Sequence, residues 1–163
     1  MMRIRTIAAS AAIVAGGTFL VAGPYMVYRG FDARAQVRAE LKAENITTPA
    51  DASRPNVRVV DGPTAIVQAE VIQKHALKAT GGKTFAEMER TDPNRQVAWQ
   101  ASTLRTALLA SALAWNVANL VIGLGVLVFA LGAVALLVGL AIRKPEQILL
   151  TTSEGLREPI ASA

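Results

Sequence analysis

Residues 106–142 read TALLASALAWNVANLVIGLGVLVFALGAVALLVGLAI and carry no charged side chain over 37 positions. As an α-helix this stretch would be about 55 Å long, at 1.5 Å per residue. The hydrocarbon core of a bilayer is about 30 Å thick, and about 20 apolar residues cross it. The stretch is therefore too long for one upright membrane span and too short for two spans joined by a turn.

The second part of this stretch, residues 121–142, is uniformly apolar and stops at the basic residue Arg143. We place a transmembrane helix there because its length matches the bilayer. This placement puts Trp115, Asn116 and Asn119 at the far membrane interface.

The helix that contains this span is expected to begin well upstream. Asp92 and Pro93 form a helix-start signal, with the aspartate as N-cap and the proline at the first helical position. We therefore expect one helix over residues 93–142. Its part from Leu104 to Ala114 would stand outside the membrane, where an apolar helix needs cover from other protein surface.

Another apolar run, residues 6–28, is also long enough to cross a bilayer, and its last residues include Tyr25 and Tyr28, which suit the membrane interface. The start of the chain resembles a signal peptide. Cleavage requires small residues before the cut, and the best candidate position is followed by Pro24. We therefore expect an uncleaved signal anchor.

The two spans predict an all-α membrane protein, with two transmembrane helices in an antiparallel hairpin and a small helical head outside the bilayer. Basic residues at both ends of the chain favour cytoplasmic termini, and a long loop translocates largely regardless of its charge. We expect a multi-pass plasma-membrane protein with a cytoplasmic start at 1–5, transmembrane helix 1 at 6–28, an extracytoplasmic head at 29–120, transmembrane helix 2 at 121–142 and a cytoplasmic tail at 143–163.

The composition excludes several classes of site and partner. The chain is 52% hydrophobic with a mean hydropathy of +0.36, and it has no cysteine, which excludes disulfides and thiolate metal sites. The net charge of +5 is spread along the chain and aromatic residues make up 5%, which argues against nucleic-acid binding. We expect the lipid bilayer and other membrane-protein subunits as partners, and no cofactor.

Small residues recur at every seventh position in both spans. A seven-residue period keeps a stripe on one side of a helix that crosses its partner at about +20°. In lipid, small residues at a contact favour close packing, although one stripe could instead face a partner protein. We expect the spans to pack through Ala9, Gly16, Gly23, Gly125, Gly132 and Gly139.

Residues 78–84, KATGGKT, contain the Gly-Lys-Thr that ends a phosphate-binding P-loop. A P-loop requires another glycine five positions before Gly82, where this chain has Leu77. We interpret the stretch as the end of one helix and the start of the next. The structural caps that we assign are Gly81 and Gly82 at the stop, Thr84 and Glu87 as a capping box, and Asp92 and Pro93 before the long helix.

The remainder of the head is also helix-prone. The first span can continue as helix over residues 29–45, and Pro63 opens a helix to Thr80 that carries alanines on one narrow face. These two helices are the nearest cover for the apolar residues 104–114. We expect Leu109 to lie in the resulting core.

His75 is the only histidine in the chain. One histidine without cysteine cannot form the usual zinc site or a two-histidine iron site, and no serine or threonine is marked as a nucleophile by its local pattern. We therefore expect no enzymatic activity and no metal site. The alternative is a membrane-surface enzyme or ligand-binding module that uses His75, Lys83 and Glu87.

Three segments resemble a family of small actinobacterial membrane proteins: LKAENI at 41–46, AEVIQKHALKATGGKTFAEMERTDPNR at 69–95, and WQASTLRTALLASALAWNVANLVIGLGVL at 99–127. Members are often labelled aromatic ring-opening dioxygenases. Extradiol iron sites use two histidines and a carboxylate, whereas this chain has one histidine. The resemblance implies a two-span protein with an extracytoplasmic helical head, and it suggests an accessory subunit of an actinobacterial respiratory supercomplex.

Single cysteines test this topology, because the natural chain has none. We expect Ser53→Cys to react with a membrane-impermeant thiol reagent in intact cells, since residue 53 belongs to the extracytoplasmic head. Ser153→Cys, in the expected tail, is the matched control and should react only after the membrane is permeabilised. Labelling at position 153 alone in intact cells would reverse the assignment.

Overall fold

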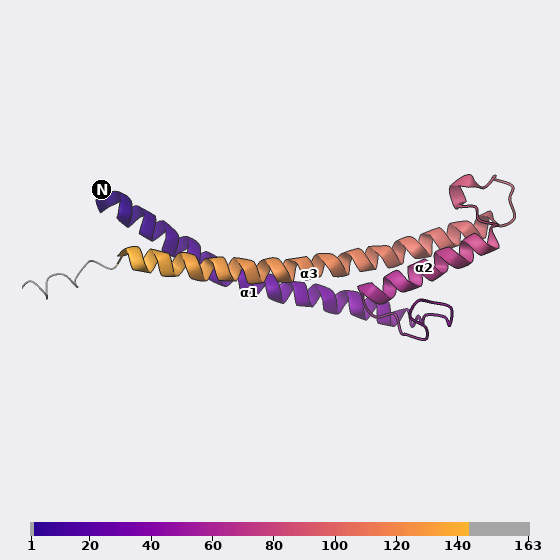
Figure 1. The fold of residues 1–163 in the computed structure, drawn as a ribbon, viewed down its shortest axis with the longest axis horizontal. Coiled ribbons are helices and arrows are strands. Elements are labelled where there is room, and N and C mark those ends of the chain that lie inside the picture. Colours follow the sequence, from indigo (N-terminus) through magenta and orange to yellow (C-terminus); the bar gives the residue numbers. More distant parts are fainter. Residues whose placement is uncertain (1, 144–163) are drawn as a thin grey trace, which may run out of the picture. The chain divides into compact units, whose positions relative to one another are not determined.

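The computed structural model describes residues 2–143, and within this range the chain is helical with no β-strand (Figure 1). It forms α1 (Met2–Ala43), α2 (Gly62–Ala79), the short 3-10 helix η1 (Phe85–Glu87) and α3 (Arg95–Arg143). Two of these helices, α1 and α3, are long and apolar enough to cross a membrane. The expected tail, beyond residue 143, lies outside the described residues.

The first long helix continues past its apolar part, as its sequence predicts. Residues 29–43 belong to α1, and the helix stops where Asn45 adopts a left-handed backbone conformation with φ of 52°. Asparagine is one of the few residues other than glycine that adopt this conformation readily. The chain then turns into the loop that leads to α2.

The other long helix begins later than its start signal predicts. α3 begins at Arg95, and the Asp92 carboxylate accepts a hydrogen bond of 2.8 Å from the backbone N–H of Asn94. Asp92 and Pro93 therefore form a turn before the helix, and they are not its N-cap and first residue. The aspartate reaches a backbone N–H two residues on, which is the local turn that competes with a helix cap.

The chain divides into two compact units. Of the described residues, one unit contains those from Met2 to Pro24 together with those from Leu127 to Arg143, and the other contains Tyr25–Val126. Both long helices contribute to each unit.

In the first unit, glycines bring the two helices into backbone contact. A Cβ atom added to Gly16 would lie 2.6 Å from the Leu136 nitrogen, and one added to Gly132 would lie 2.8 Å from the Leu20 nitrogen. A Cβ atom on Gly139 would lie 3.0 Å from the carbonyl oxygen of Ala9. These positions have no room for a side chain, so the contact requires glycine.

The second unit repeats this contact at Gly30, where an added Cβ atom would lie 2.9 Å from the carbonyl oxygen of Ala118 and 2.5 Å from Cγ1 of Ile122. Gly30 follows Gly23 by seven residues, and Ala118 precedes Gly125 by seven. The small-residue period therefore extends one step further along each helix than the two spans indicate.

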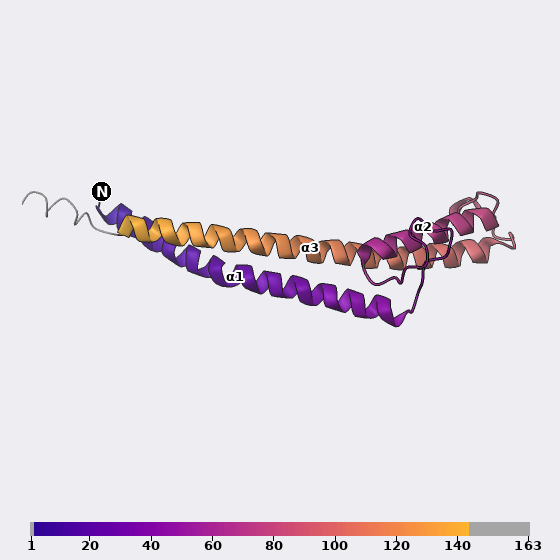
Figure 2. The same ribbon diagram turned by 60° about the horizontal axis from the view of Figure 1, so that its bottom comes forward.

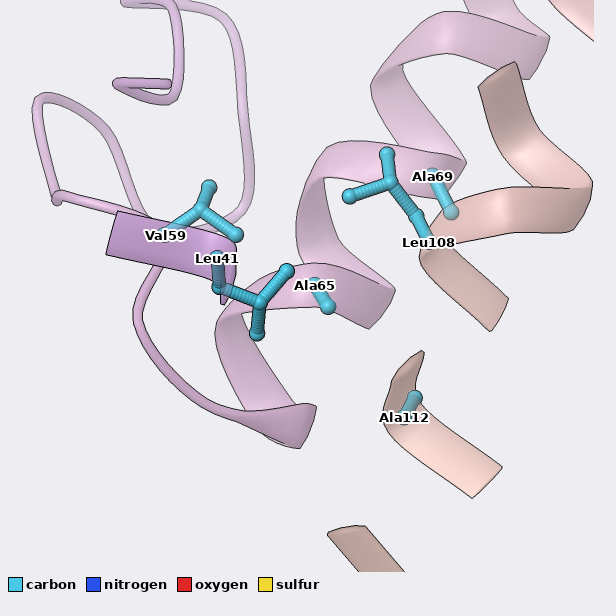
Figure 3. Packing of buried hydrophobic residues seen from close by; sticks show 6 residues of the cluster. All are labelled: Leu41, Val59, Ala65, Ala69, Leu108 and Ala112. Carbon is cyan, nitrogen blue, oxygen red and sulfur yellow. The ribbon is translucent and has the colours of Figure 1, made fainter. Parts of the chain in front are cut away.

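Packing between α1, α2, α3 and the loop before α2 forms the core of the second unit. Figure 2 shows α2 lying along the first turns of α3. Figure 3 shows the buried cluster that joins the elements, which contains Leu41, Val59, Ala65, Ala69, Leu108 and Ala112. The alanines of α2 let it approach α3 closely. The core leucine is Leu108, which is 6% exposed, whereas the expected Leu109 is 38% exposed.

Glycine-to-alanine substitutions distinguish positions on α1 that contact α3 from positions with free space around them. We expect Gly16→Ala to destabilise the folded protein by about 1–3 kcal/mol, because its methyl group meets the backbone of α3. Gly17→Ala is the matched control, since nothing lies within 4 Å of its added Cβ atom, and it should stabilise the helix by about 0.5–1 kcal/mol. Reversible unfolding in mixed lipid–detergent micelles measures both, and equal effects would contradict the contact.

Candidate functional site

One face of α3 remains uncovered in the second unit. Leu109, Leu113, Val117 and Leu120 are separated by four, four and three residues, which places them on one side of the helix. All four side chains are exposed, and Leu113 is 64% exposed. We call these four residues the apolar stripe, and contiguous exposed apolar residues of this kind often mark an interaction surface.

The opposite side of α3 is covered at the same level. The Trp115 ring is buried, with the guanidinium of Arg34 4.4 Å and that of Arg38 5.4 Å from its centroid. A Cβ atom added to Gly62, the first residue of α2, would lie 2.9 Å from Trp115. Trp115 was expected at the membrane interface, but its ring is enclosed by protein and anchors α2 and the charged part of α1.

The predicted packing residues all lie at buried positions. Ala9, Gly16 and Gly23 of α1 are buried, and so are Gly125, Gly132 and Gly139 of α3. Contacts with the other helix are resolved for Ala9, Gly16, Gly132 and Gly139 in the first unit. Sequence reasoning missed Gly30 and Ala118, although both continue the same seven-residue period.

The KATGGKT stretch forms a helix stop followed by a short helical turn. Gly81 and Gly82 have φ of 66° and 88°, and the Gly82 N–H donates to the Leu77 carbonyl at 2.7 Å. The Glu87 carboxylate accepts hydrogen bonds of 2.7 Å from both the N–H and the hydroxyl of Thr84. These bonds, the backbone one first, lower the pKa of Glu87. The helix that follows, η1, has three residues.

His75 contacts a loop residue that its sequence position does not reveal. Its Nε2 lies 2.9 Å from Oδ2 of Asp51, and Nζ of Lys74 lies 2.9 Å from the same oxygen. The hydrogen bonds from Lys74 and then from His75 lower the pKa of Asp51 to about 2. The three side chains thereby fasten the loop before α2 onto α2.

The three residues of the alternative site make different contacts. His75 pairs with Asp51 and Glu87 pairs with Thr84. Lys83 lines a cavity of about 270 Å³ that neither His75 nor Glu87 lines. Among the described residues no hydrogen bond joins the three side chains, although the charge of Lys83 contributes to lowering the pKa of Glu87.

Among residues 2–143, no group of three His, Cys, Asp or Glu side chains could hold a metal ion. Comparisons with protein-family models, with curated proteins and with solved structures found no match to this chain.

The Asp51 contacts should depend on pH. The pKa of Asp51 falls from 3.8 to about 2 on folding, so its contribution is complete above about pH 4 and is lost as the pH falls through 2. We expect Asp51→Asn to increase the mobility of a nitroxide label at residue 53 at pH 6, and to have little effect well below pH 2, where the Asp51 carboxyl is protonated. Asp32→Asn is the control, because Asp32 bonds only within α1, to Arg29 and Gln36. Unchanged mobility at pH 6 would contradict the role of Asp51.

Proposed function

We propose that this protein is a non-enzymatic integral membrane protein that crosses the plasma membrane twice and serves as an accessory or assembly subunit of a larger membrane complex. In this proposal α1 and α3 form an antiparallel hairpin, and the head lies on the extracytoplasmic side. The observation that carries the proposal is the apolar stripe on α3, which no part of the described chain covers.

The contacts between α1 and α3 support a membrane boundary on the C-terminal side of the apolar stripe. The charged part of α1 begins at Arg29, and its neighbour Gly30 lies against Ala118 and Ile122 of α3. If the hydrocarbon region ends before Arg29 on α1, it also ends near Ile122 on α3, because Gly30 and Ile122 are in contact. Residues 106–120 of α3 would then extend about 20 Å beyond the hydrocarbon region, at 1.5 Å per residue. The apolar stripe lies in this segment.

The chemistry of the stripe favours a membrane-protein partner. Each large aliphatic side chain that becomes fully buried contributes roughly 1.5–3 kcal/mol, so four of them form a substantial contact surface. The exposed apolar face also continues from Leu120 to Leu124, towards the part of α3 that we assign to the bilayer. A partner helix that itself emerges from the membrane could cover this face without interruption.

Two further observations support a binding role over a catalytic one. His75 bonds to Asp51 and Glu87 bonds to Thr84, and no hydrogen bond among the described residues links either of them to Lys83. The resemblance to small actinobacterial membrane proteins points to the same class and suggests a respiratory complex as the partner. That identification stays a prediction from the sequence.

Two leucine substitutions test the proposal. Leu113→Asp should remove the tagged protein from its complex in native membranes solubilised with a mild detergent, because a carboxylate would be buried at the contact. The chain itself should stay folded, since Leu113 is exposed. Leu104→Asp is the matched control, because Leu104 is 58% exposed and about two and a half turns away, on the other side of α3. Native electrophoresis measures the size of the complex.

Two results would contradict the proposal. One is a natural protein that migrates alone under conditions that keep other membrane complexes intact. The other is a complex that resists Leu113→Asp as well as it resists Leu104→Asp.

A further inference from the structure

A cavity of about 270 Å³ lies in the head between the second half of α2, the segment around η1 and the first turns of α3. This volume is just below the range of about 300–1,000 Å³ that is usual for small-molecule sites. The cavity therefore suits a small ligand. Its apolar lining includes Ala76, Leu77, Phe85, Ala98 and Ala101.

Hydrogen bonds fix the wall of the cavity that carries Lys83. The Thr80 hydroxyl donates to the Lys83 carbonyl at 2.5 Å, and the Glu87 carboxylate holds the next residue, Thr84. The Arg95 guanidinium donates to the carbonyl oxygens of Phe85 and Met88, and it lies 4.1 Å from the centroid of the Phe85 ring. The segment is thus ordered before any ligand binds, which reduces the entropic cost of binding.

The charge of the cavity is positive. Lys83 and Arg105 are its charged lining residues, and no carboxylate lines it. Neither side chain has a hydrogen-bond or ion-pair partner among the described residues, although Arg105 is half-buried. Glu87, whose pKa the charge of Lys83 helps to lower, is already bonded to Thr84. A partly buried guanidinium without a partner favours an anion beside it.

We propose that this cavity binds a small organic anion, namely a carboxylate attached to a short apolar chain. Arg105 pairs with the carboxylate through its planar pair of donors, and Lys83 contributes a second positive charge. Ser102 supplies a hydroxyl group at the same cavity. The apolar chain lies against the alanines, Leu77 and Phe85. The site is distinct from the apolar stripe, so it does not depend on the proposed function.

A photoreactive octanoate tests the site on the full chain in nanodiscs of zwitterionic lipid. We expect the probe to label residues that line the cavity, with unlabelled octanoate competing and octanol competing poorly. Arg105→Gln should weaken labelling about tenfold or more, since a hydrogen bond to a charged group contributes about 1.5–3 kcal/mol. Arg90→Gln is the matched control, because Arg90 is exposed and does not line this cavity.

A second variant tests the volume of the cavity without changing its charge. Ala101→Leu fills the cavity while it retains Arg105 and Lys83, and it should also abolish labelling. Helix content and thermal unfolding of each variant show whether the head stays folded. Three results would overturn the proposal: labelling that Arg105→Gln leaves unchanged in a folded protein, competition by octanol equal to that by octanoate, or competition by inorganic phosphate as effective as octanoate.

Discussion

A small residue at every seventh position lets α1 and α3 approach until the backbone of one helix touches the other. At Gly16 and Gly132 in the first unit, and at Gly30 in the second, an added methyl group would meet backbone atoms of the facing helix. Between helices in lipid, apolar surface alone gives little drive for association, so this close packing is what holds such a pair together. The contact also fixes which residues of the two helices lie at the same level.

Gly30 of α1 and Ala118 of α3 lie at the same level of the second unit, and the composition of the two helices changes at this level. Beyond this level α1 becomes charged while α3 stays apolar for many more residues. α1 and α2 cover one side of that apolar helix through Leu41 and the alanines of α2, and through Arg34 and Gly62, which lie against Trp115 of α3. The other side, the apolar stripe, has no cover within the described chain, and this imbalance motivates the proposed partner.

Much of this arrangement could be predicted from sequence, because local signals carry it. The glycine stop, the Thr84–Glu87 pair and the period of the small residues depend on short-range spacing. The choice between Leu108 and Leu109 depends on how α3 is rotated, which an almost entirely apolar helix does not reveal. Contacts between residues far apart in the sequence could not be predicted. Nothing in the sequence links Asp51 to His75, or indicates that Lys83 and Arg105 line the same cavity.

The most direct test of the account is a disulfide between α1 and α3 in native membranes. Cγ1 of Ile13 lies 2.7 Å from the position of a Cβ atom on Gly139, so cysteines at these two positions would be close enough to bond in a chain without natural cysteine. The account predicts that Ile13→Cys with Gly139→Cys forms an intramolecular disulfide on mild oxidation. Val14→Cys with Gly139→Cys should not, because Val14 is exposed and faces away from the contact. Equal cross-linking of both pairs, or only cross-links between chains, would contradict the pairing of α1 with α3.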